Sequence, residues 1–230
     1  MRPEGAVTVD SAASWSADAR VACDALYREI FALPFVRGVA DGTLPRAVFA
    51  RYLGQDALYL AAYSHAMQCL AGRLSAGPDR DLFARFAADG VAAERAMQER
   101  WLADAGGVGG TALPTPACRR SMEHVRMAES APVPVAMAAV LPCFSVYAEV
   151  GARLAAGLAA GHPYREWIAE YSGAGFTDDA RAVAACCDAA AQRNPELRPA
   201  MLAAYRAGVE AERDFWGAGF LEFQGGSTPL

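Results

Sequence analysis

Hydrophobic residues recur every three to four positions along most of the 230-residue chain, with polar residues between them. This spacing places the apolar side chains on one face of an α-helix. Ala22, Leu26 and Ile30 show it near the start of the chain. No segment shows the sustained alternation of apolar and polar residues that is typical of a β-strand. The pattern therefore predicts an all-α fold.

Capping residues and helix breakers predict where the helices begin and end. Ser14 or Ser16 is expected to cap the first helix, and Leu33–Pro34 ends it because the residue before a proline disfavours the helical conformation. Pro45 suits the first position of the next helix, where the missing N–H group of proline leaves no bond unmade. The first predicted helix ends at about residue 32. The later predicted helices span about 46–73, 78–105, 115–129, 134–160, 163–172, 177–192 and 196–222.

This series of helices contains no repeat, low-complexity block or domain-sized linker. The sequence therefore predicts one helical domain over residues 14–223, a flexible N-terminal segment over 1–13 and a C-terminal tail over 224–230. The most apolar stretch, residues 131–148, approaches the length of a membrane span. Pro132, Pro134 and Pro142 interrupt it, so we interpret it as a buried helix and expect no membrane association.

All 21 basic residues are arginines, so the chain contains no lysine. This excludes a Schiff base with pyridoxal phosphate, the lysine of a phosphate-binding P-loop and the strand lysine of a protein kinase. A formal net charge of −5 gives no basic field for nucleic acid, so no nucleic-acid partner is expected. The N-terminal sequence has no apolar core of a secretory signal, which predicts a cytoplasmic protein.

The six cysteines and three histidines do not have the spacing of metal ligands. No C-x-x-C, H-E-x-x-H or E-x-x-H sequence occurs, and most of the cysteines fit small buried residues of a cytosolic protein. Gly107-x-Gly109-x-x-Ala112 resembles part of a dinucleotide-binding fingerprint, but no strand precedes it, so we interpret it as a linker. We therefore expect neither a metal nor a cofactor.

Cys143 is the first candidate for chemistry. It stands four residues before Tyr147, which places both side chains on one face of a helix. Pro142 suggests a helix break directly before Cys143, and a helix N-terminus lowers the pKa of a thiol and favours the nucleophilic thiolate. The alternative is a buried cysteine in an Ala-rich core helix.

Asp56 is the second candidate, because it stands among tyrosine and leucine residues where a carboxylate is costly to bury. Tyr59 follows three residues later and can face the same site. A carboxylate among aromatic rings can anchor an amine-like or amidine-like ring through charge-assisted hydrogen bonds. The alternative is a solvent-facing acid on an amphipathic helix.

Glu212 is the third candidate and lies in a charged run of the last predicted helix. Helical spacing places it beside Phe215 and Trp216, and about 200° away from Asp214. Burial beside aromatic rings raises the pKa of a glutamate toward neutrality, which suits general acid–base catalysis. The alternative is a solvated charge run. The aromatic pair Trp167–Tyr171, spaced i and i+4, is interpreted as packing.

Several short motifs follow one another in order along nearly the whole chain. They are Pro34-Phe35-Val36, Asp41-Gly42-Thr43-Leu44-Pro45, Tyr52-Leu53-Gly54-Gln55-Asp56, Tyr59-Leu60, Leu141-Pro142-Cys143 with Tyr147 and Glu149-Val150-Gly151, Trp167-Ile168 with Tyr171, and Glu212 with Phe215-Trp216. As an ordered set they resemble the TenA family, the aminopyrimidine aminohydrolases also called thiaminase II. The resemblance implies a single-domain, haem-oxygenase-like helical bundle without haem, assembled as a homotetramer or homodimer.

The resemblance also implies a reaction, namely hydrolysis of the aminomethyl-pyrimidine of degraded thiamin, and of thiamin itself, to hydroxymethyl-pyrimidine. It implies that Cys143 is the nucleophile that adds to the pyrimidine ring and that Glu212 is the acid and base that protonates the ring. Asp56 is implied to hydrogen-bond the amino edge of the pyrimidine. The implied orienting and pocket-lining residues are Tyr59, Tyr147 and Tyr171, with Phe215 as a further candidate.

The chain departs from the family pattern at two places. Leu33 stands where the family usually has histidine before the Pro–Phe pair. The helix before Leu141 usually supplies a tyrosine that closes over the substrate, whereas residues 117–130 contain no aromatic residue and Arg120 stands near that place. Because arginine prefers an anionic partner, a modified pyrimidine or another heterocycle stays an alternative substrate. A non-catalytic regulatory or binding protein is a further alternative.

Overall fold

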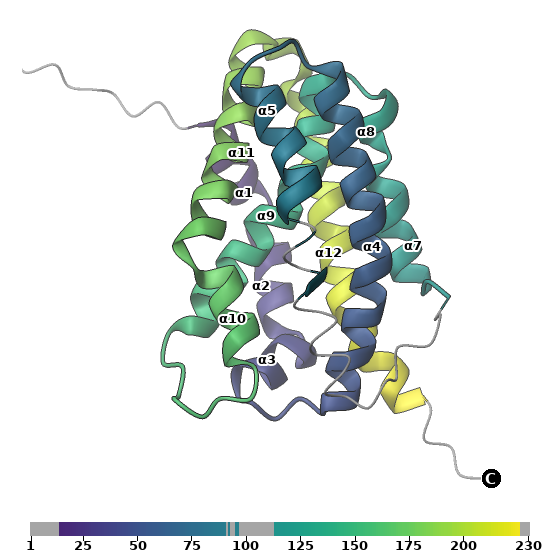
Figure 1. Cartoon of the computed structure of the whole chain (residues 1–230), viewed down its shortest axis with the longest axis vertical. Coiled ribbons are helices and arrows are strands. Elements are labelled where there is room, and N and C mark those ends of the chain that lie inside the picture. Colours follow the sequence, from purple (N-terminus) through teal and green to yellow (C-terminus); the bar gives the residue numbers. More distant parts are fainter. Residues whose placement is uncertain (1–13, 91, 93–94, 97–112, 226–230) are drawn as a thin grey trace, which may run out of the picture.

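The computed structural model describes residues 14–90, 92, 95–96 and 113–225, and every regular element in these ranges is helical (Figure 1). The predicted all-α fold is confirmed for this part of the chain. In order, the elements are α1 (Trp15–Ala22), α2 (Asp24–Ala32), α3 (Pro34–Ala40), α4 (Arg46–Arg73), α5 (Pro78–Arg85), a π-helical turn (Phe86–Gly90), α7 (Pro116–Val125), α8 (Met127–Ser130), α9 (Val133–Ala155), α10 (Arg165–Ser172), α11 (Ala174–Arg193), a 3₁₀ turn (Pro195–Leu197) and α12 (Arg198–Gly225).

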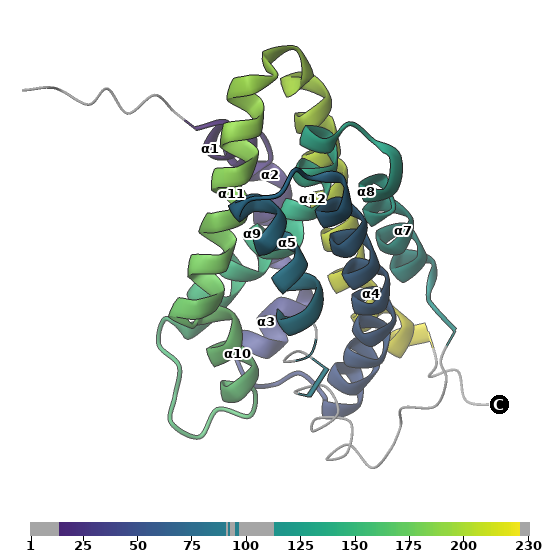
Figure 2. The ribbon, with the colours of Figure 1, turned by 45° about the horizontal axis from the view of Figure 1, so that its top comes forward.

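Helix α9 is at the centre of the bundle. It packs against α10, α11 and α12, and α12 in turn packs against α4 and α7. Helices α4 and α12 run side by side, with α7 and α8 on one flank and α10 and α11 on the other (Figure 1 and Figure 2). Three long helices from distant parts of the sequence, α4, α9 and α12, therefore share one interior.

Helix α9 is mostly apolar, and several helices surround it. Val135, Ala138, Leu141 and Val146 are each no more than 5% exposed. Among the described helices, α9 has the length and hydropathy of a membrane span, but most of it is buried inside the bundle. Full burial of a Val or Leu side chain contributes about 1.5–3 kcal/mol. The prediction of a buried helix in residues 131–148 is therefore confirmed.

Aromatic rings form a cluster where α3, α4, α10 and α12 meet. The ring centroids of Phe35 and Tyr52 are 4.8 Å apart, and Trp216 meets Phe35 edge-on at 5.8 Å. Trp167 packs against the same Trp216 ring at 5.8 Å. Tilted and edge-on pairs of this kind contribute about 0.5–1.5 kcal/mol beyond their buried area. The cluster fixes Trp216 and with it the turn of α12 that carries Glu212.

The N-terminal helices confirm two details of the prediction and change two. Ser14 caps α1, and its hydroxyl accepts a hydrogen bond from the N–H group of Ala17 at 3.3 Å. The first predicted helix is interrupted at Cys23 (φ −102°, ψ 9°) and continues as α2. Helix α2 ends at Ala32 with Leu33 as its C-cap, as predicted, and Pro34 is in addition the first residue of α3, a short helix that the pattern does not predict and in which its fixed φ is favourable. Phe35 and its neighbours anchor this short helix in the core.

Two long helices end differently from their predicted bounds, whereas α4 has its predicted range. The sequence predicts Pro45 at the first helical position of α4. It is instead the N-cap, in an extended conformation (φ −61°, ψ 134°), and Arg46 is the first helical residue. Helix α9 ends at Ala155, before the predicted residue 160, and Gly157 follows with φ 90°, a conformation that favours glycine. Helix α12 continues to Gly225, so its last two residues belong to the predicted tail.

Three predictions fall wholly or partly outside the described residues. They are the helix beyond residue 90 with the glycine run after it, the N-terminal segment 1–13 and the end of the tail, 226–230. The predicted domain boundaries therefore stay predictions.

Candidate active site

Helices α4, α9 and α12 bring the three predicted chemical groups together. Tyr59 on α4 connects them, because its hydroxyl is in hydrogen-bond contact with the thiol of Cys143 on α9 and with the carboxyl group of Glu212 on α12. Asp56, one turn before Tyr59, is close enough for its negative charge to act on Glu212. Residues separated by about 70 to 150 positions in sequence thus meet at one site. We call Asp56, Tyr59, Cys143 and Glu212 the carboxylate site.

Both acids of the carboxylate site are buried. Asp56 is 3% exposed and Glu212 is 5% exposed, and among the described residues these are the two carboxylates in the buried class. The alternatives of a solvent-facing Asp56 and of a solvated charge run around Glu212 are therefore wrong. Two buried acids side by side repel each other when both are charged, so one of them tends to hold a proton.

Glu212 is the acid whose proton affinity the site raises. Burial is the largest cause and the negative charge of Asp56 is the second, and together they raise the pKa of Glu212 to about 8. The Tyr59 hydroxyl and the indole N–H of Trp216 oppose this shift, because both donors favour the charged carboxylate, although the Trp216 N–H makes no hydrogen bond of normal geometry. A carboxyl group with a pKa near neutrality can give and take a proton at physiological pH, which is the requirement for general acid–base catalysis.

The two tyrosines nearest the acids remain neutral phenols. Burial raises the pKa of Tyr59 well above its usual value, with further contributions from Cys143 and Glu212. The pKa of Tyr147 is raised by burial first, and then by Tyr52 and the two acids. The hydroxyls of Tyr147 and Tyr52 lie 2.6 Å apart and share a hydrogen bond. Both phenols therefore serve as hydrogen-bond partners and not as bases.

Aromatic rings enclose the carboxylate site. The ring of Tyr171 on α10 lies 4.8 Å from that of Tyr147. Phe215 on α12 lies 5.8 Å from Tyr59, and the Trp216 ring lies 4.9 Å from Tyr147. The predicted pair Trp167–Tyr171 packs at 4.9 Å, as expected for a packing contact. Tyr171 and Phe215 thus lie against the tyrosines of the site.

Cys143 is partly buried and lies in the middle of α9. The predicted helix break at Pro142 is wrong, because α9 runs continuously from Val133 through Pro142 to Ala155. The field of a helix N-terminus falls off within its first turn, so it does not activate this thiol. The Tyr59 hydroxyl is a neighbouring group that contacts this thiol.

Contacts with two other helices support the proline inside α9. Pro142 has no N–H group to complete the helical bonding of its turn. His124 of α7 lies with Nε2 3.0 Å from the carbonyl oxygen of Ala139. A Cβ atom on Gly208 of α12 would lie 2.6 Å from Cγ of Pro142 and 2.8 Å from Nε2 of His124. The close packing of α12 on this turn therefore requires glycine.

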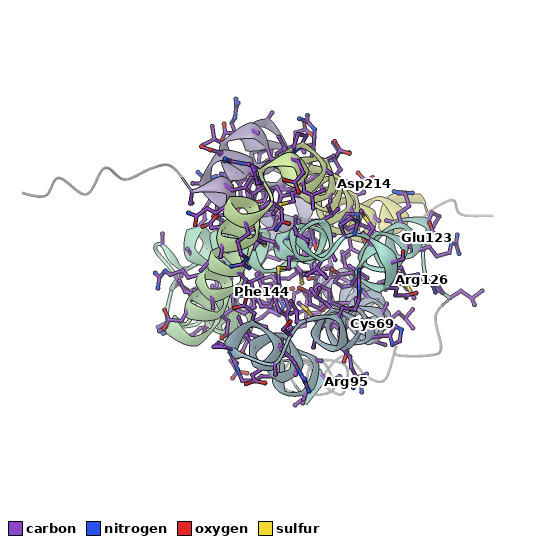
Figure 3. The ribbon with its side chains drawn as sticks, turned by 90° about the horizontal axis from the view of Figure 1, so that it is seen from above. Cys69, Arg95, Glu123, Arg126, Phe144 and Asp214 are labelled. Atoms are coloured by element: carbon purple, nitrogen blue, oxygen red, sulfur yellow. The ribbon has the colours of Figure 1, made fainter. Side chains whose placement is uncertain are left out.

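Arg120 lies apart from the carboxylate site. Its side chain is 54% exposed, and its guanidinium forms an ion pair with Asp214 at 3.1 Å. Figure 3 shows Asp214 at the outside of the bundle and Phe144, the neighbour of Cys143, inside it. The suggestion that Arg120 belongs to the site is therefore not supported by its position.

Cys118 is the residue of α7 that lies near Asp56, and the sequence reasoning missed it. It is fully buried, and burial together with the charge of Asp56 raises the pKa of its thiol to about 11. Its Sγ lies 3.5 Å from the carbonyl oxygen of Gln55. Its N–H group donates the capping bond to the Thr115 hydroxyl at 3.1 Å, which marks the start of α7. This helix has its predicted start at about residue 115, but the approach of Cys118 to Asp56 depends on how α7 packs against α4, which no signal in the sequence indicates.

Comparisons with known proteins show the family of this chain. A family model described as the TENA/THI-4/PQQC family matches residues 21–222. Two proteins named thiamine biosynthesis multifunctional protein ThiED, from Corynebacterium efficiens and Corynebacterium glutamicum, are 33% and 31% identical over 82% and 79% of this chain. The chain spans 26% and 24% of their lengths. The aminopyrimidine aminohydrolase of Bacillus subtilis is 29% identical over 90% of this chain and 89% of its own.

Solved structures show the same fold. The TenA homologue from P. horikoshii superposes with a TM-score of 0.82 at 22% identity, covering 90% of this chain and 98% of its own. A putative TenA-like thiaminase from Sulfolobus solfataricus superposes with a TM-score of 0.71 at 18% identity, covering 89% and 95%. The predicted haem-oxygenase-like helical bundle is confirmed by this likeness.

Proposed function

The chain belongs to the TENA/THI-4/PQQC family, and from this premise we propose that it hydrolyses thiamin-derived aminopyrimidines. The reaction converts aminomethyl-pyrimidine and water to hydroxymethyl-pyrimidine and ammonia, and thiamin is cleaved in the same way. The observation that carries the proposal is the Tyr59 hydroxyl, which contacts both the Cys143 thiol and the Glu212 carboxyl group beside Asp56. The similarity to the aminopyrimidine aminohydrolase of Bacillus subtilis supports this substrate class.

In this proposal, Asp56 and Glu212 bind and polarise the pyrimidine. The buried carboxylate of Asp56 accepts hydrogen bonds from the amino group on the ring, and such charge-assisted bonds are strong away from water. Glu212, with its pKa of about 8, is protonated near neutral pH and donates its proton to a ring nitrogen. Protonation withdraws electrons from the ring and makes a neighbouring ring carbon electrophilic.

Cys143 is the nucleophile. Its sulfur bonds to the activated ring carbon, and the thiol proton passes by way of Tyr59 to the departing amine, which leaves the methylene carbon as ammonia. Water then adds its hydroxyl group to that methylene carbon while the Glu212 carboxylate accepts the remaining water proton. Finally the sulfur–carbon bond breaks and the sulfur recovers a proton from the ring nitrogen. The aromatic pyrimidine, the Glu212 acid and the thiol are thereby restored.

The experiment that tests this function measures hydroxymethyl-pyrimidine by chromatography after incubation of purified protein with aminomethyl-pyrimidine. We expect Cys143→Ser to lower kcat/KM by about 10³-fold because the hydroxyl is a much weaker nucleophile. Cys69→Ser is the matched control, since Cys69 lies on the partly exposed face of α4 beside His65, away from the carboxylate site. Full activity of Cys143→Ser would rule out the nucleophile.

A pyrimidine with a larger substituent is a second candidate substrate, favoured by the face that α7 presents. Cys118 lies near Asp56, and the Ser121 hydroxyl is 3.5 Å from the carbonyl oxygen of Ala211, the residue before Glu212. Both are small side chains, one near Asp56 and the other against the backbone next to Glu212. Thermal-shift measurements with a series of substituted pyrimidines distinguish the candidates, because a ligand at 100 times its Kd stabilises the fold by about 2.7 kcal/mol.

The homotetramer or homodimer implied by the family stays a prediction. Light scattering coupled to size-exclusion chromatography measures it directly, against a chain mass of 24.3 kDa.

A further inference from the structure

Two buried indole N–H groups lack a hydrogen bond of normal geometry among the described residues, those of Trp167 and Trp216. Both side chains are fully buried. A buried donor without an acceptor costs about 1–3 kcal/mol, and such groups are rare in folded proteins. Each of the two therefore requires an explanation.

Trp216 cannot turn away to find another acceptor. Its ring is fixed by Phe35 edge-on at 5.8 Å, by Tyr52 at 5.7 Å and by Tyr147 at 4.9 Å. Gly217, the next residue on α12, lies against Leu33, so this turn of the helix is packed as well. The direction of the indole N–H group is therefore set by the aromatic cluster.

The acid that this N–H group meets is Glu212. Trp216 follows Glu212 by four residues on α12, which places both side chains on one face of the helix. Trp216 acts on Glu212 as a hydrogen-bond donor, although its Nε1 makes no bond within normal geometric limits. The N–H group therefore lies near enough to the carboxyl group to favour its charged form, but outside the limits of a normal hydrogen bond.

Trp167 differs from Trp216 in this respect. It belongs to the same aromatic cluster, with its ring 5.8 Å from Phe49 and 4.9 Å from Tyr171. Its N–H group is equally buried, but Trp167 does not contribute to the pKa shift of Glu212. The chain thus supplies its own control, an indole of the same kind and burial that does not act on the acid.

We propose that Trp216 is a positioning residue for Glu212, whose indole N–H closes onto the carboxylate as a hydrogen bond when Glu212 loses its proton. The inference rests on the proposed acid–base role of Glu212. It explains why the donor has no bond while the acid is neutral. It also assigns a function to the i, i+4 spacing of the two residues.

The other groups facing Glu212 make such a donor necessary. Asp56 presents a second negative charge from α4, and Tyr59 presents a neutral hydroxyl from the same helix. Tyr147 faces Glu212 from α9 and also remains neutral. Arg213, the next residue along α12, is paired with Glu29 and Asp214 on the outside. A Glu212 carboxylate that accepts a proton from water is therefore stabilised by neutral donors, and Trp216 is one whose ring is fixed by packing.

Indole NMR tests this inference without any turnover. The chain has four tryptophans, Trp15, Trp101, Trp167 and Trp216, so an indole ¹H–¹⁵N spectrum contains four Nε1–H signals. Each single Trp→Phe substitution removes one signal and so assigns it. If Trp216→Phe does not fold, the other three variants assign their signals and the remaining one belongs to Trp216. We expect the Trp216 signal to move downfield as the pH passes through about 8 and the Trp167 signal to stay in place. In Glu212→Gln the movement of the Trp216 signal should disappear.

A Trp216 signal that does not titrate, or that titrates equally in Glu212→Gln, would overturn the inference. If the protein does not hydrolyse aminopyrimidines but the signal titrates as expected, the inference stands and the proposed reaction fails. In an active enzyme, Trp216→Phe should move the midpoint of the pH–rate profile about half a unit to one unit upward, because the charged acid loses a donor. Trp167→Phe should leave that midpoint unchanged, and an equal shift in both variants would reduce Trp216 to a packing role.

Discussion

Two buried polar clusters lie on opposite sides of α9 and differ in how completely their hydrogen bonds are made. The first is the carboxylate site around Cys143. The second, which we call the hydroxyl cluster, consists of Tyr27, Ser145 and Tyr205, whose three hydroxyls form a closed ring with oxygen–oxygen distances of 2.7, 2.9 and 3.0 Å. Each hydroxyl can donate one bond and accept one, so the ring is complete within the protein.

The comparison distinguishes a cluster that stabilises the fold from a cluster that can act on a ligand. A complete buried network stabilises one packing arrangement and leaves no group to act on a ligand. The carboxylate site instead holds two acids whose charges repel each other, and a fixed indole N–H without a bond of normal geometry. Such a site costs stability and is typical of functional residues. Ser145 and Cys143 are only two positions apart on α9, so the helix itself divides the two clusters.

The largest expected effect comes from removing the proton exchange of the carboxylate site. Glu212→Gln keeps the shape of the side chain but cannot give or take a proton, so we expect kcat/KM for aminomethyl-pyrimidine to fall by about 10³-fold. Steady-state kinetics measure it, with Glu210→Gln as the control on the exposed face of α12. If Glu212→Gln keeps full activity, the acid–base assignment is wrong.

The same substitution should change how stability depends on pH. The pKa of Glu212 is raised in the folded protein to about 8 from its ordinary 4.5, so its protonation stabilises the fold fully below pH 4.5. This stability is lost progressively as the pH rises from 4.5 to 8, because the unfolded state has then released the proton while the folded state still holds it. Relative to Glu212→Gln, the wild type should lose on the order of 4 kcal/mol between pH 4.5 and 8. Urea unfolding of both proteins across this range measures the difference, and parallel curves would contradict it.

Gly208 lies on α12 between Tyr205 of the hydroxyl cluster and Glu212 of the carboxylate site. Gly208→Ala places a Cβ atom 2.6 Å from Pro142 and should destabilise the fold by about 1–3 kcal/mol through overpacking. It should also lower activity, because Pro142 precedes Cys143. Thermal unfolding and kinetics measure both effects.

Gly72→Ala is the control for this glycine, since nothing lies within 4 Å of its added Cβ atom in α4. The alanine should stabilise this helix by about 0.5–1 kcal/mol. Equal behaviour of the two variants would show that the packing of α12 on Pro142 is not tight.

The smallest expected effect belongs to the hydroxyl cluster. Tyr205→Phe removes one hydroxyl, and the hydroxyls of Tyr27 and Ser145 still bond each other at 2.9 Å. We therefore expect a loss of about 1 kcal/mol in the free energy of unfolding, with kcat/KM unchanged. A large loss of activity in this variant would mean that the two clusters are not separate in function.

The fold could be predicted well from the sequence where local signals agree. Helix α4 has its predicted range because Pro45 and the extended Leu74 mark its ends. Local signals failed where tertiary packing decides. The first helix ends before Pro34 as predicted, but the signals do not show that α3 begins there, with Phe35 buried in the core. They also predict a break at Pro142, where α9 continues and α7 and α12 pack on that turn.

The members of the carboxylate site could be predicted from their types and motif order, but their convergence could not. Helical spacing shows which residues share a face, such as Asp56 with Tyr59, but not which other helix that face meets. Arg120 and Cys118 illustrate the limit. They stand two residues apart on α7, and only the rotation of the packed helix shows that Cys118 lies near Asp56 while Arg120 pairs with Asp214 outside.

The central claim, that Cys143 and the two buried acids form one pyrimidine site, is tested most directly by protection of the thiol. Peptide mass spectrometry after brief iodoacetamide treatment measures the labelling of Cys143, with Cys69 as the internal reference. We predict that aminomethyl-pyrimidine slows labelling of Cys143 at least about tenfold in the wild type, leaves Cys69 unchanged and gives no protection in Asp56→Asn, whose affinity for the ring is lost. Labelling of Cys143 at the same rate with and without saturating pyrimidine would contradict the account.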